Sequence, residues 1–507
     1  LCTKAIKSCS IPKRTSECKT IFIHLAGIGR REANVITFHF YFWGGHTMAA
    51  RTRDMTRGNP TKLILSFCLP IIAGNLFQQF YSLVDTLVIG RVEGVTALAA
   101  VSAAGWLDWT VLGLAMGMAQ GFSIQIAQSF GAGDYAELRR AAGQSILLSA
   151  AITVVLTLLS ELLLWPMLTA LRSPENTIGL TCQYLRVIFG GVVFVMSFNL
   201  LSGFLRSLGD SRTPLIAMTT AALCNIGLDI LFVAVFRWGV NGVSIATVMS
   251  QCLSSLICLL ALRKMPVIRI TRADLKPDSR VMRKLMALGV PIAFQNLIIS
   301  VGALVLQRVV NGFGFIFMAG FNAATRLTGL IELAGNSLGS AVSTFAGQNL
   351  GAKRLDRVRL GLRRSAQIGV GMALAIALLV VLFGRSVLSL FINDDPALVE
   401  QVLTVGCRYL YVASAGLFML YLLFVYRSTL QGLGDTVTPM ISGVVELVMR
   451  IGNALLLPLL IGEWGAYFAE ISAWIGAAIF LIFGYYRRMR ILSAQFGESP
   501  SPTPEKA

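Results

Sequence analysis

Acidic side chains within long apolar stretches are the residues of this sequence best placed to do chemistry. Asp85 is flanked by Leu83, Val84, Leu87 and Val88. A carboxylate inside a bilayer costs about 2.5–3.5 kcal/mol on insertion scales, so such a residue needs a function or a partner. A desolvated carboxyl group binds a proton more readily, so Asp85 could take up a proton or help to hold Na⁺. The alternative is a structural hydrogen bond between helices.

A second polar pair lies further along the chain, where Asn225 precedes Asp229 by four residues. This spacing places both side chains on one face of a helix. Amide and carboxylate oxygens are ligands that suit hard cations such as Na⁺. The same two groups could equally form a hydrogen-bonded pair that responds to protonation, and the spacing does not choose between these two chemistries.

Several classes of catalytic site are excluded from the body of the chain. All three histidines lie in the first 46 residues, no CxxC pair occurs, and no GxxxxGK[ST] loop is present. These absences argue against a Ser-His-Asp triad, a histidine metal cluster and an ATPase. We therefore expect a protein that is not an enzyme, carries no cofactor and draws the energy for any uphill work from a partner or an ion gradient.

The composition indicates the elements that must position these side chains. Of 507 residues, 55% are hydrophobic and 13% are charged, whereas soluble proteins have about 25% charged residues. Twelve membrane helices of 20–25 residues would use about 240–300 residues, and 55% of 507 is about 279. The sequence therefore predicts an all-α polytopic membrane protein with twelve spans, two of them near 181–204 and 315–345.

The net charge of +18 is distributed unevenly between the apolar stretches. Even-numbered breaks hold nineteen Lys and Arg residues and odd-numbered breaks hold four. Because cytoplasmic loops carry the excess of basic residues, both termini are predicted to be cytoplasmic, in a plasma-membrane protein with no nucleic-acid partner. The nineteen are Arg139, Arg140, Arg206, Arg212, Arg263, Lys264, Arg269, Arg272, Lys276, Arg280, Arg283, Lys284, Lys353, Arg354, Arg357, Arg359, Arg363, Arg364 and Arg427.

Residues 1–54 differ from the rest of the chain, because they hold every histidine and their apolar clusters are too short to span a bilayer. We interpret them as a non-native or disordered leader, the alternative being a targeting extension. The remaining predicted parts are a six-helix lobe over 55–262, a basic connector over 263–284, a second six-helix lobe over 285–490 and a tail over 491–507.

An internal repeat supports this division. Leu69-Pro70-Ile71 matches Val290-Pro291-Ile292, AQSFGAGD from Ala127 matches GQNLGAKR from Gly347, and LRSLGDSRTP from Leu205 matches LQGLGDTVTP from Leu430. Asn75 likewise matches Asn296. An even number of spans per repeat gives both lobes the same orientation, related by a pseudo-two-fold axis along the membrane normal, with a cleft between them. This arrangement favours a transporter over a static scaffold.

The repeated segments resemble those of the multidrug and toxic compound extrusion (MATE) transporters. The resemblance rests on the stretch PIIAGNLFQQFYSLVDT from Pro70, the two GLGD loops, GQNLGA at 347–352 and the Asn225–Asp229 pair, and it covers about residues 56–490. It implies ion-coupled export of organic, often cationic, compounds in exchange for H⁺ or Na⁺. It also implies that Asp85, Asn225, Asp229 and Thr247 form the cation-binding cluster, with Na⁺ a candidate at the first three. Thr247 could instead bond only its own backbone.

Four further residues are candidates for contact with the substrate: Gln78, Tyr81, Glu332 and Glu470. Tyr81 could contribute a cation–π contact. Either glutamate could face the cleft and attract a cationic compound, or could simply sit near Arg326 and a helix end. By contrast, the four-residue spacing of Glu446 and Arg450 favours a structural ion pair within one helix.

Two other functions compete with ion-coupled export of a small organic molecule by a monomer in the lipid bilayer. A lipid-linked oligosaccharide flippase of the same wider superfamily would need a more cationic cleft, whereas many basic residues here lie in loops. A non-transporting membrane protein would have no reason to bury Asp85, Asn225 and Asp229.

Overall fold

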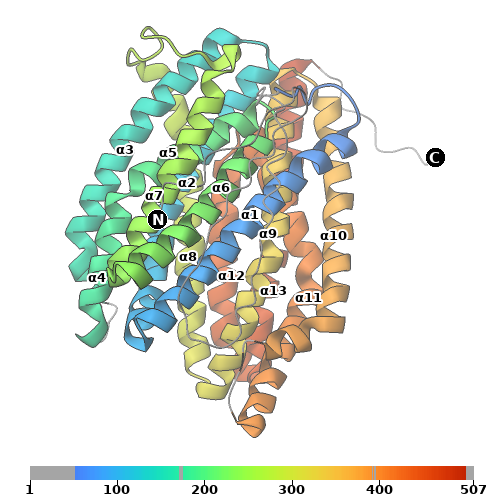
Figure 1. Ribbon diagram of the computed structural model, residues 1–507. Helices are drawn as coiled ribbons and strands as arrows, with labels where there is room; N and C mark the ends of the chain where they lie inside the picture. Colours follow the sequence, from blue (N-terminus) through green and yellow to red (C-terminus); the bar gives the residue numbers. More distant parts are fainter. Residues whose placement is uncertain (1–51, 171–174, 391, 393–394, 498–507) are drawn as a thin grey trace, which may run out of the picture. The chain divides into compact units, whose positions relative to one another are not determined.

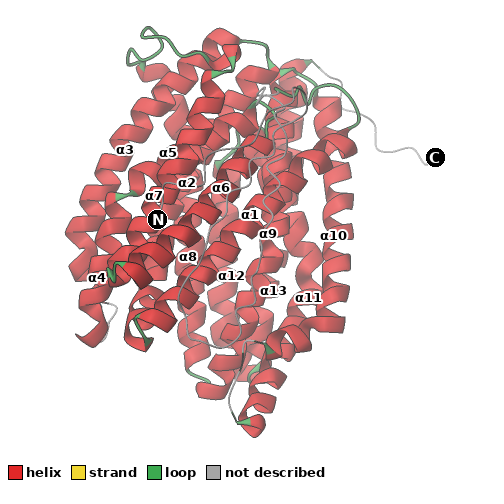
Figure 2. Ribbon diagram, in the orientation of Figure 1, coloured by secondary structure: helices red, strands yellow, loops and turns green. Residues whose placement is uncertain are grey.

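The computed structural model describes residues 52–170, 175–390, 392 and 395–497, which are helical and contain no strand (Figures 1 and 2). The interpretation of residues 1–54 as a leader falls almost entirely outside the described residues, as do the three histidines and the tail from residue 498.

Two sets of helices follow one another along the chain, and we name them the first and second lobes. The first lobe comprises α1 (Pro60–Val92), α2 (Val95–Gly131), α3 (Tyr135–Ala170), α4 (Glu175–Gly190), α5 (Val192–Ser207), α6 (Arg212–Asp229), the π-helix η1 (Ile230–Val235) and α7 (Gly239–Arg263). A connector with one short 3₁₀ turn, η2 (Pro266–Ile268), leads to the second lobe. That lobe comprises α8 (Ser279–Asn311), α9 (Phe315–Gly351), α10 (Leu355–Ser389), α11 (Pro396–Gly432), α12 (Val437–Ile461) and α13 (Trp464–Phe496).

The predicted membrane-spanning architecture is confirmed, although two spans differ from expectation. Among the described residues ten helices are long and apolar enough to cross a bilayer, and α4 with α5 makes an eleventh span bent by 45°. The twelfth membrane-length helix, α9, has 37 residues and is less apolar because it carries Arg326, Glu332 and several amide and hydroxyl side chains. These polar side chains explain why α9 is less apolar than the other membrane-length helices.

The bend between α4 and α5 interrupts the span expected near 181–204. It falls at Gly190-Gly191, and adjacent glycines are a known cause of helix bends. A Cβ on Gly191 would lie 2.9 Å from one methyl carbon of Val248 on α7 and closer still to the other. Close approach of α7 therefore requires a glycine at this position.

The internal duplication is visible in the helices themselves. α2 and α9 each contain 37 residues, and they begin at positions 95 and 315. The duplicated GLGD loops have the same construction in both lobes, because Gly209 (φ 87°) and Gly434 (φ 74°) adopt left-handed conformations. Asp210 and Asp435 then accept hydrogen bonds from the first turn of the following helix. These motifs therefore cap helices.

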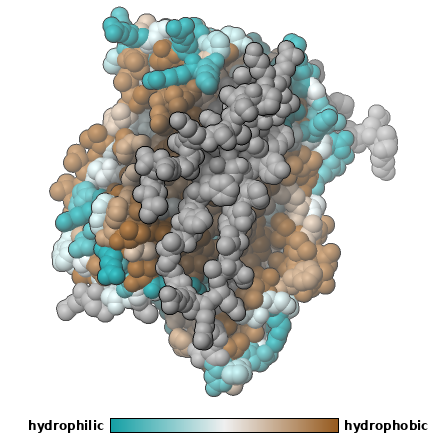
Figure 3. Space-filling view, viewed as in Figure 1, coloured by the Kyte–Doolittle hydropathy of each residue, from teal (hydrophilic) through white to brown (hydrophobic). Residues whose placement is uncertain are grey.

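One end of the bundle, which we call the basic end, carries the loops 131–135, 207–212, 263–279, 351–355 and 432–437. Hydrophilic side chains gather at the two ends of the face in Figure 3, and hydrophobic side chains cover much of the flanks between them. On α10 the side chains of Leu378, Leu379 and Leu382 are all more than half exposed. An exposed apolar helix face of this kind is suited to lipid.

The two lobes meet closely at the basic end through symmetrical contacts. Gln348 of the second lobe donates a hydrogen bond to the carbonyl of Ser207 (2.8 Å), and Gln128 of the first lobe donates to the carbonyl of Gly432 (2.9 Å). The backbone N–H of Met55, just before α1, also donates to Gln348 Oε1 (2.8 Å). The lobes are therefore joined at the basic end by buried polar contacts.

Glycines make this junction possible. A Cβ on Gly131 would lie 2.6 Å from Cα of Gln348, and a Cβ on Gly351 would lie 2.8 Å from the backbone N of Ala132. Further into the bundle, a Cβ on Gly121 of α2 would lie 2.6 Å from the backbone N of Gly289 on α8. Only glycine allows the two backbones to approach so closely.

Candidate cation and substrate site

Three neighbouring helices of the first lobe carry the predicted cation-binding residues. α1 packs against α6, and α6 packs against α7; Figure 1 shows α1 between α6 and α9. The side chains of Asp85 of α1 and Asp229 of α6 lie close enough to interact electrostatically. Asn225 lies one turn earlier on α6, and both it and Asp229 are 0% exposed. Tertiary packing therefore brings together two carboxyl groups that are 144 residues apart.

The polar atoms of this cluster are unsatisfied. Within the described part of the chain, both side-chain oxygens of Asp229, both polar atoms of Asn225, and Asp85 Oδ1 are buried without a hydrogen-bond partner. The hydroxyl of Thr247 on α7 is likewise buried and unpartnered. A buried polar group left unpaired costs about 1–3 kcal/mol. The cluster therefore gathers several unpaired polar atoms in one buried part of the first lobe.

Other polar residues join the cluster, and sequence reasoning missed three of them. Tyr184 of α4 lies within electrostatic range of Asp85, Asp229, Tyr81 and Asp108. Asp108, on α2, has a buried oxygen without a partner. The rule that drew attention to Asp85, a carboxylate inside an apolar stretch, would also have found Asp108.

Tyr81 and Gln78, two predicted substrate residues, lie on the same segment of α1 as Asp85. Tyr81 lies near Gln78 and near Gln251 of α7, and the buried Oε1 atom of Gln251 has no hydrogen-bond partner. Gln251, the third residue missed, is one turn from Thr247 and shares its helical face. Gln78 is exposed, so this side of the cluster is open to a small molecule.

The backbone changes its winding directly after Asp229. Residues Ile230–Val235 form a π-helix that continues α6. π-helical turns are rare and are frequent at functional sites, because the extra residue in the turn re-aims the side chains around it. Nothing in the hydrophobic pattern of this span distinguishes a π-helix from an α-helix, so only the structure could reveal it.

The three buried aspartates of this cluster have no ion-pair partner among the described residues. Across the residues described, no Lys or Arg forms an ion pair with Asp85, Asp108 or Asp229. A buried carboxylate in that situation must bind a proton or a cation to be stable. No three His, Cys, Asp or Glu side chains of the described chain converge to hold a metal ion. Any Na⁺ here would therefore depend on the amide and hydroxyl oxygens of Asn225 and Thr247.

The second lobe contrasts with the first because Glu446 and Glu470 lie beside arginines, although Glu332 forms no ion pair among the described residues. Glu446 of α12 accepts from Arg427 (2.9 Å) and from Arg450 (2.8 Å). The structure thus contains the predicted ion pair between Glu446 and Arg450, and it shows Arg427 as a second partner of Glu446. Arg427, counted above among loop residues, is instead buried inside α11. Its positive charge is paired with Glu446 inside the second lobe.

Glu332 and Glu470 belong to this second-lobe network. Glu470 of α13 lies 3.9 Å from Arg450 and accepts a hydrogen bond from the hydroxyl of Tyr409. Glu332 of α9 is within electrostatic range of Glu470, Arg450 and Glu446. The structure therefore places the four candidate substrate residues in two separate groups, with Gln78 and Tyr81 in the first lobe and the two glutamates in the second.

The less apolar helix α9 has one exposed polar face. Exposed or half-buried positions recur at Asn322, Thr325, Gly329, Asn336 and Ser340. The positions of α2 that lie 220 residues earlier, 102, 105, 109, 116 and 120, are exposed as well. Two repeat-related helices thus leave equivalent faces uncovered, and in α9 that face is too polar to suit lipid. Arg326 is exposed next to Thr325 on this face.

A duplicated bundle of membrane-length helices that holds unneutralised buried carboxyl groups defines a polytopic membrane transporter. Comparison with known proteins then identifies the family. The MatE family model matches residues 70–231 and 291–456, and the chain belongs to this family. The predicted resemblance and the predicted two-lobe fold are both confirmed.

Relatives with assigned names agree with this result. The chain is 31% identical over 350 residues to "Probable multidrug resistance protein YpnP" of Bacillus subtilis, covering 68% of this chain and 77% of that protein. It is 27% identical over 440 residues to "Probable multidrug resistance protein YoeA" of the same organism, covering 83% of this chain and 92% of the relative. A "FAD transporter" of Shewanella oneidensis is 26% identical over 357 residues, covering 69% of this chain and 78% of that protein.

Solved structures match the fold closely. A transporter of the MOP superfamily from Pyrococcus furiosus superimposes with a TM-score of 0.82 at 24% identity, covering 87% of this chain and 98% of that one. An outward-facing MATE family transporter gives a TM-score of 0.80 at 23% identity, with the same coverage.

Proposed function

We propose that the protein is an antiporter that exports organic compounds, cationic ones above all, in exchange for H⁺ or Na⁺. The observation that carries this proposal is the group of first-lobe carboxyls without a cationic partner, beside the unpartnered oxygens of Asn225 and Thr247. Each carboxyl group is stable in its buried position only when a proton or cation accompanies it.

The exchange follows from competition for these carboxyls. When Asp85 and Asp229 are ionised, their charge attracts a cationic compound toward Tyr81 and Gln78 on the same helix. When a proton or Na⁺ binds them, that attraction is lost and the compound is released. A gradient supplies about 2.3 kcal/mol per charge for each 100 mV across the membrane.

The arrangement of the lobes supports a conformation open to the outside. The contacts of Gln128, Gln348 and Gly131 close the basic end. The exposed faces of α2 and α9 are the surfaces that we propose to line the cleft. By the positive-inside rule the basic end faces the cytoplasm, with both termini on that side of the plasma membrane. We propose a monomer, because the two lobes of one chain supply both of the helices, α2 and α9, that we propose to line the cleft.

Transport by proteoliposomes tests the coupling. We expect Asp85→Asn and Asp229→Asn to abolish efflux of a fluorescent organic cation under an imposed pH or sodium gradient. The control is Glu161→Gln: Glu161 is also a first-lobe carboxyl, but it already has a partner in Arg186, 3.9 Å away. Imposing the two gradients separately identifies the ion. Undiminished gradient-driven efflux by both aspartate variants would refute the proposal, and no efflux by the native protein under either gradient would favour a non-transporting role or a flippase.

Arg326 favours a second candidate, export of an anionic compound. It lies on the exposed polar face of α9, and the relative named "FAD transporter" shows that proteins similar to this one are assigned an anionic cargo. Under this alternative, Arg326→Gln reduces efflux of a flavin nucleotide and leaves efflux of an organic cation unchanged. Efflux of the cation alone, insensitive to this substitution, favours the first candidate.

A further inference from the structure

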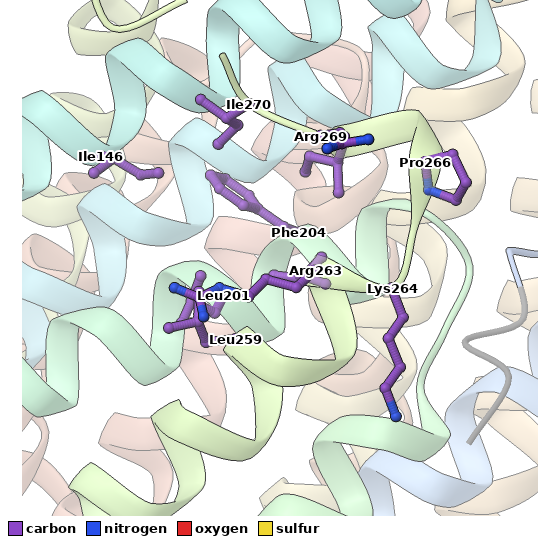
Figure 4. Close-up of a pocket in the computed structure, with 11 residues that line it drawn as sticks. Ile146, Leu201, Phe204, Leu259, Arg263, Lys264, Pro266, Arg269 and Ile270 are labelled. Atoms are coloured by element: carbon purple, nitrogen blue, oxygen red, sulfur yellow. The ribbon is translucent and has the colours of Figure 1, made fainter. Parts of the chain in front are cut away.

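A cavity of about 520 Å³ lies at the basic end of the first lobe, away from the carboxyl cluster (Figure 4). It is enclosed by α3, α5, the last turn of α7 and the connector that follows. A volume in this range is typical of ligand-binding pockets. The lining residues are Ile146, Leu201, Phe204, Leu259, Leu262, Arg263, Lys264, Pro266, Ile268, Arg269 and Ile270.

The cavity is apolar inside and cationic at its margin. Eight of the eleven lining residues are hydrophobic or proline, and the other three are basic. Figure 4 shows Arg263 beside Leu201 and Leu259, and Arg269 between Ile270 and Pro266, whereas Lys264 extends away from the apolar residues. A ligand that fits both parts must join an anionic group to hydrocarbon.

The positive charge of the margin is not neutralised by the protein. In the described chain no carboxylate forms an ion pair with Arg263 or Arg269. The neighbouring acidic residues are engaged elsewhere: Asp278 pairs with Arg140 at 3.8 Å, and Asp274 accepts hydrogen bonds from Thr271. Both arginines are exposed and free to meet a partner from outside.

The hydrocarbon path continues from the cavity toward the bilayer. Leu256 and Leu260, two turns and one turn before the end of α7, are 48% and 49% exposed. Each lies two or three residues before a lining residue, Leu259 or Leu262, on the same helix. Because α7 ends at Arg263, where the chain enters the polar connector, the cavity mouth lies at the level expected for lipid headgroups.

We propose that this cavity binds an anionic glycerophospholipid. Arg263 and Arg269 supply the positive charge that attracts its headgroup, and Leu201, Phe204 and Leu259 contact the first part of its acyl chains. Basic pockets between membrane helices on the cytoplasmic side recognise such headgroups. The orientation proposed above places this lipid in the cytoplasmic leaflet. The charged and apolar contacts that bind the lipid do not depend on that orientation. A soluble phosphate compound would leave the apolar interior unused, which is why we assign the site to a lipid.

Native mass spectrometry of the purified full chain, with phosphatidylglycerol and phosphatidylcholine as probes, tests the proposal. We expect the R263Q/R269Q variant to lose about 30-fold of the preference for phosphatidylglycerol, the effect of two interfacial cations at about 1 kcal/mol each. The matched control, R272Q/K276Q, removes the same charge from the same connector at exposed positions outside the cavity, and its preference should be unchanged.

Two further measurements keep the test decisive. Leu259→Trp fills the cavity and leaves both arginines in place, so it should also abolish the preference, even where the double variant is poorly folded. Glycerol 3-phosphate, which carries the anionic group without acyl chains, should give no bound species. Three results would each overturn the assignment to a lipid. The first is an equal loss of the preference for phosphatidylglycerol in R263Q/R269Q and R272Q/K276Q, and the second is a preference retained by Leu259→Trp. The third is binding of glycerol 3-phosphate equal to that of phosphatidylglycerol.

Discussion

Substituting Gly131 by alanine should open the junction between the lobes at the basic end. An added Cβ would lie 2.6 Å from Cα of Gln348, while ordinary van der Waals contact begins at 3.4 Å. The carbonyl oxygen of Gln348 would be closer still, so the two backbones must separate by more than 0.8 Å, the difference between 3.4 and 2.6. That movement also weakens the hydrogen bond from Gln128 to the carbonyl of Gly432, which is 2.9 Å long. Overpacking of this kind costs about 1–3 kcal/mol.

This cost acts only on the closed junction, so it shifts the balance between conformations. At 1.4 kcal/mol for each factor of ten, the ratio of closed to open protein should fall about 5- to 150-fold. We would place spin labels at Ala136 and Arg363, exposed positions near the basic ends of α3 and α10, with the other cysteines removed. Double electron–electron resonance should then show a longer distance population in Gly131→Ala.

The same helix provides a matched control. A Cβ on Gly105 would have no atom within 4 Å, so Gly105→Ala adds the same methyl group without a clash. It should leave the distance distribution unchanged and, because alanine favours a helix over glycine, stabilise the protein by up to about 1 kcal/mol. Identical distance distributions in the two variants would refute the view that the glycine contact holds this end closed.

Three further substitutions test the structural contacts, each by thermal unfolding of the detergent-solubilised protein. Asp435→Ala removes the cap of α12 and should cost about 1 kcal/mol; an unchanged midpoint would show that the duplicated loop does not act as a cap. Glu446→Gln leaves two buried arginines without their shared carboxylate and should cost about 3–5 kcal/mol, and a loss below 1 kcal/mol would contradict burial of that network. Gly191→Ala should lower the midpoint temperature of unfolding, because its methyl group would clash with Val248. An unchanged midpoint would mean that α7 can move away from the bend without a loss of stability.

The repeated motifs were recognisable in the sequence, but their purpose was not. Asn75 and Asn296 match in the repeat, and each donates a hydrogen bond into the other lobe, to Ser337 Oγ (3.0 Å) and to the carbonyl of Gly113 (2.9 Å). The AQSFGAGD and GQNLGAKR stretches likewise meet across the junction. A repeat reports common ancestry, whereas the contact partner of each residue depends on how the two copies pack.

The site was found in part from the sequence. Asp85 and Asp229 could be selected because a carboxylate in an apolar span is costly wherever it points. That rule does not say which of these carboxylates meet, which is why Glu470 was open to a role in the cleft until its contacts with Arg450 and Tyr409 were known.

The sequence by itself determined the membrane class, the duplication, the uneven distribution of the basic residues and the acidic residues that we propose to carry the function. These properties depend on composition, period and charge along the chain, which are local. Only the tertiary structure decided that Asp85, Asp108 and Asp229 lie near one another without an ion-pair partner among the described residues, while Glu446 and Glu470 of the second lobe lie beside arginines. It also decided where α4 and α5 bend, where α6 becomes a π-helix and which face of α9 is exposed. Each of these depends on which helices become neighbours, and that is set by packing between residues far apart in the chain.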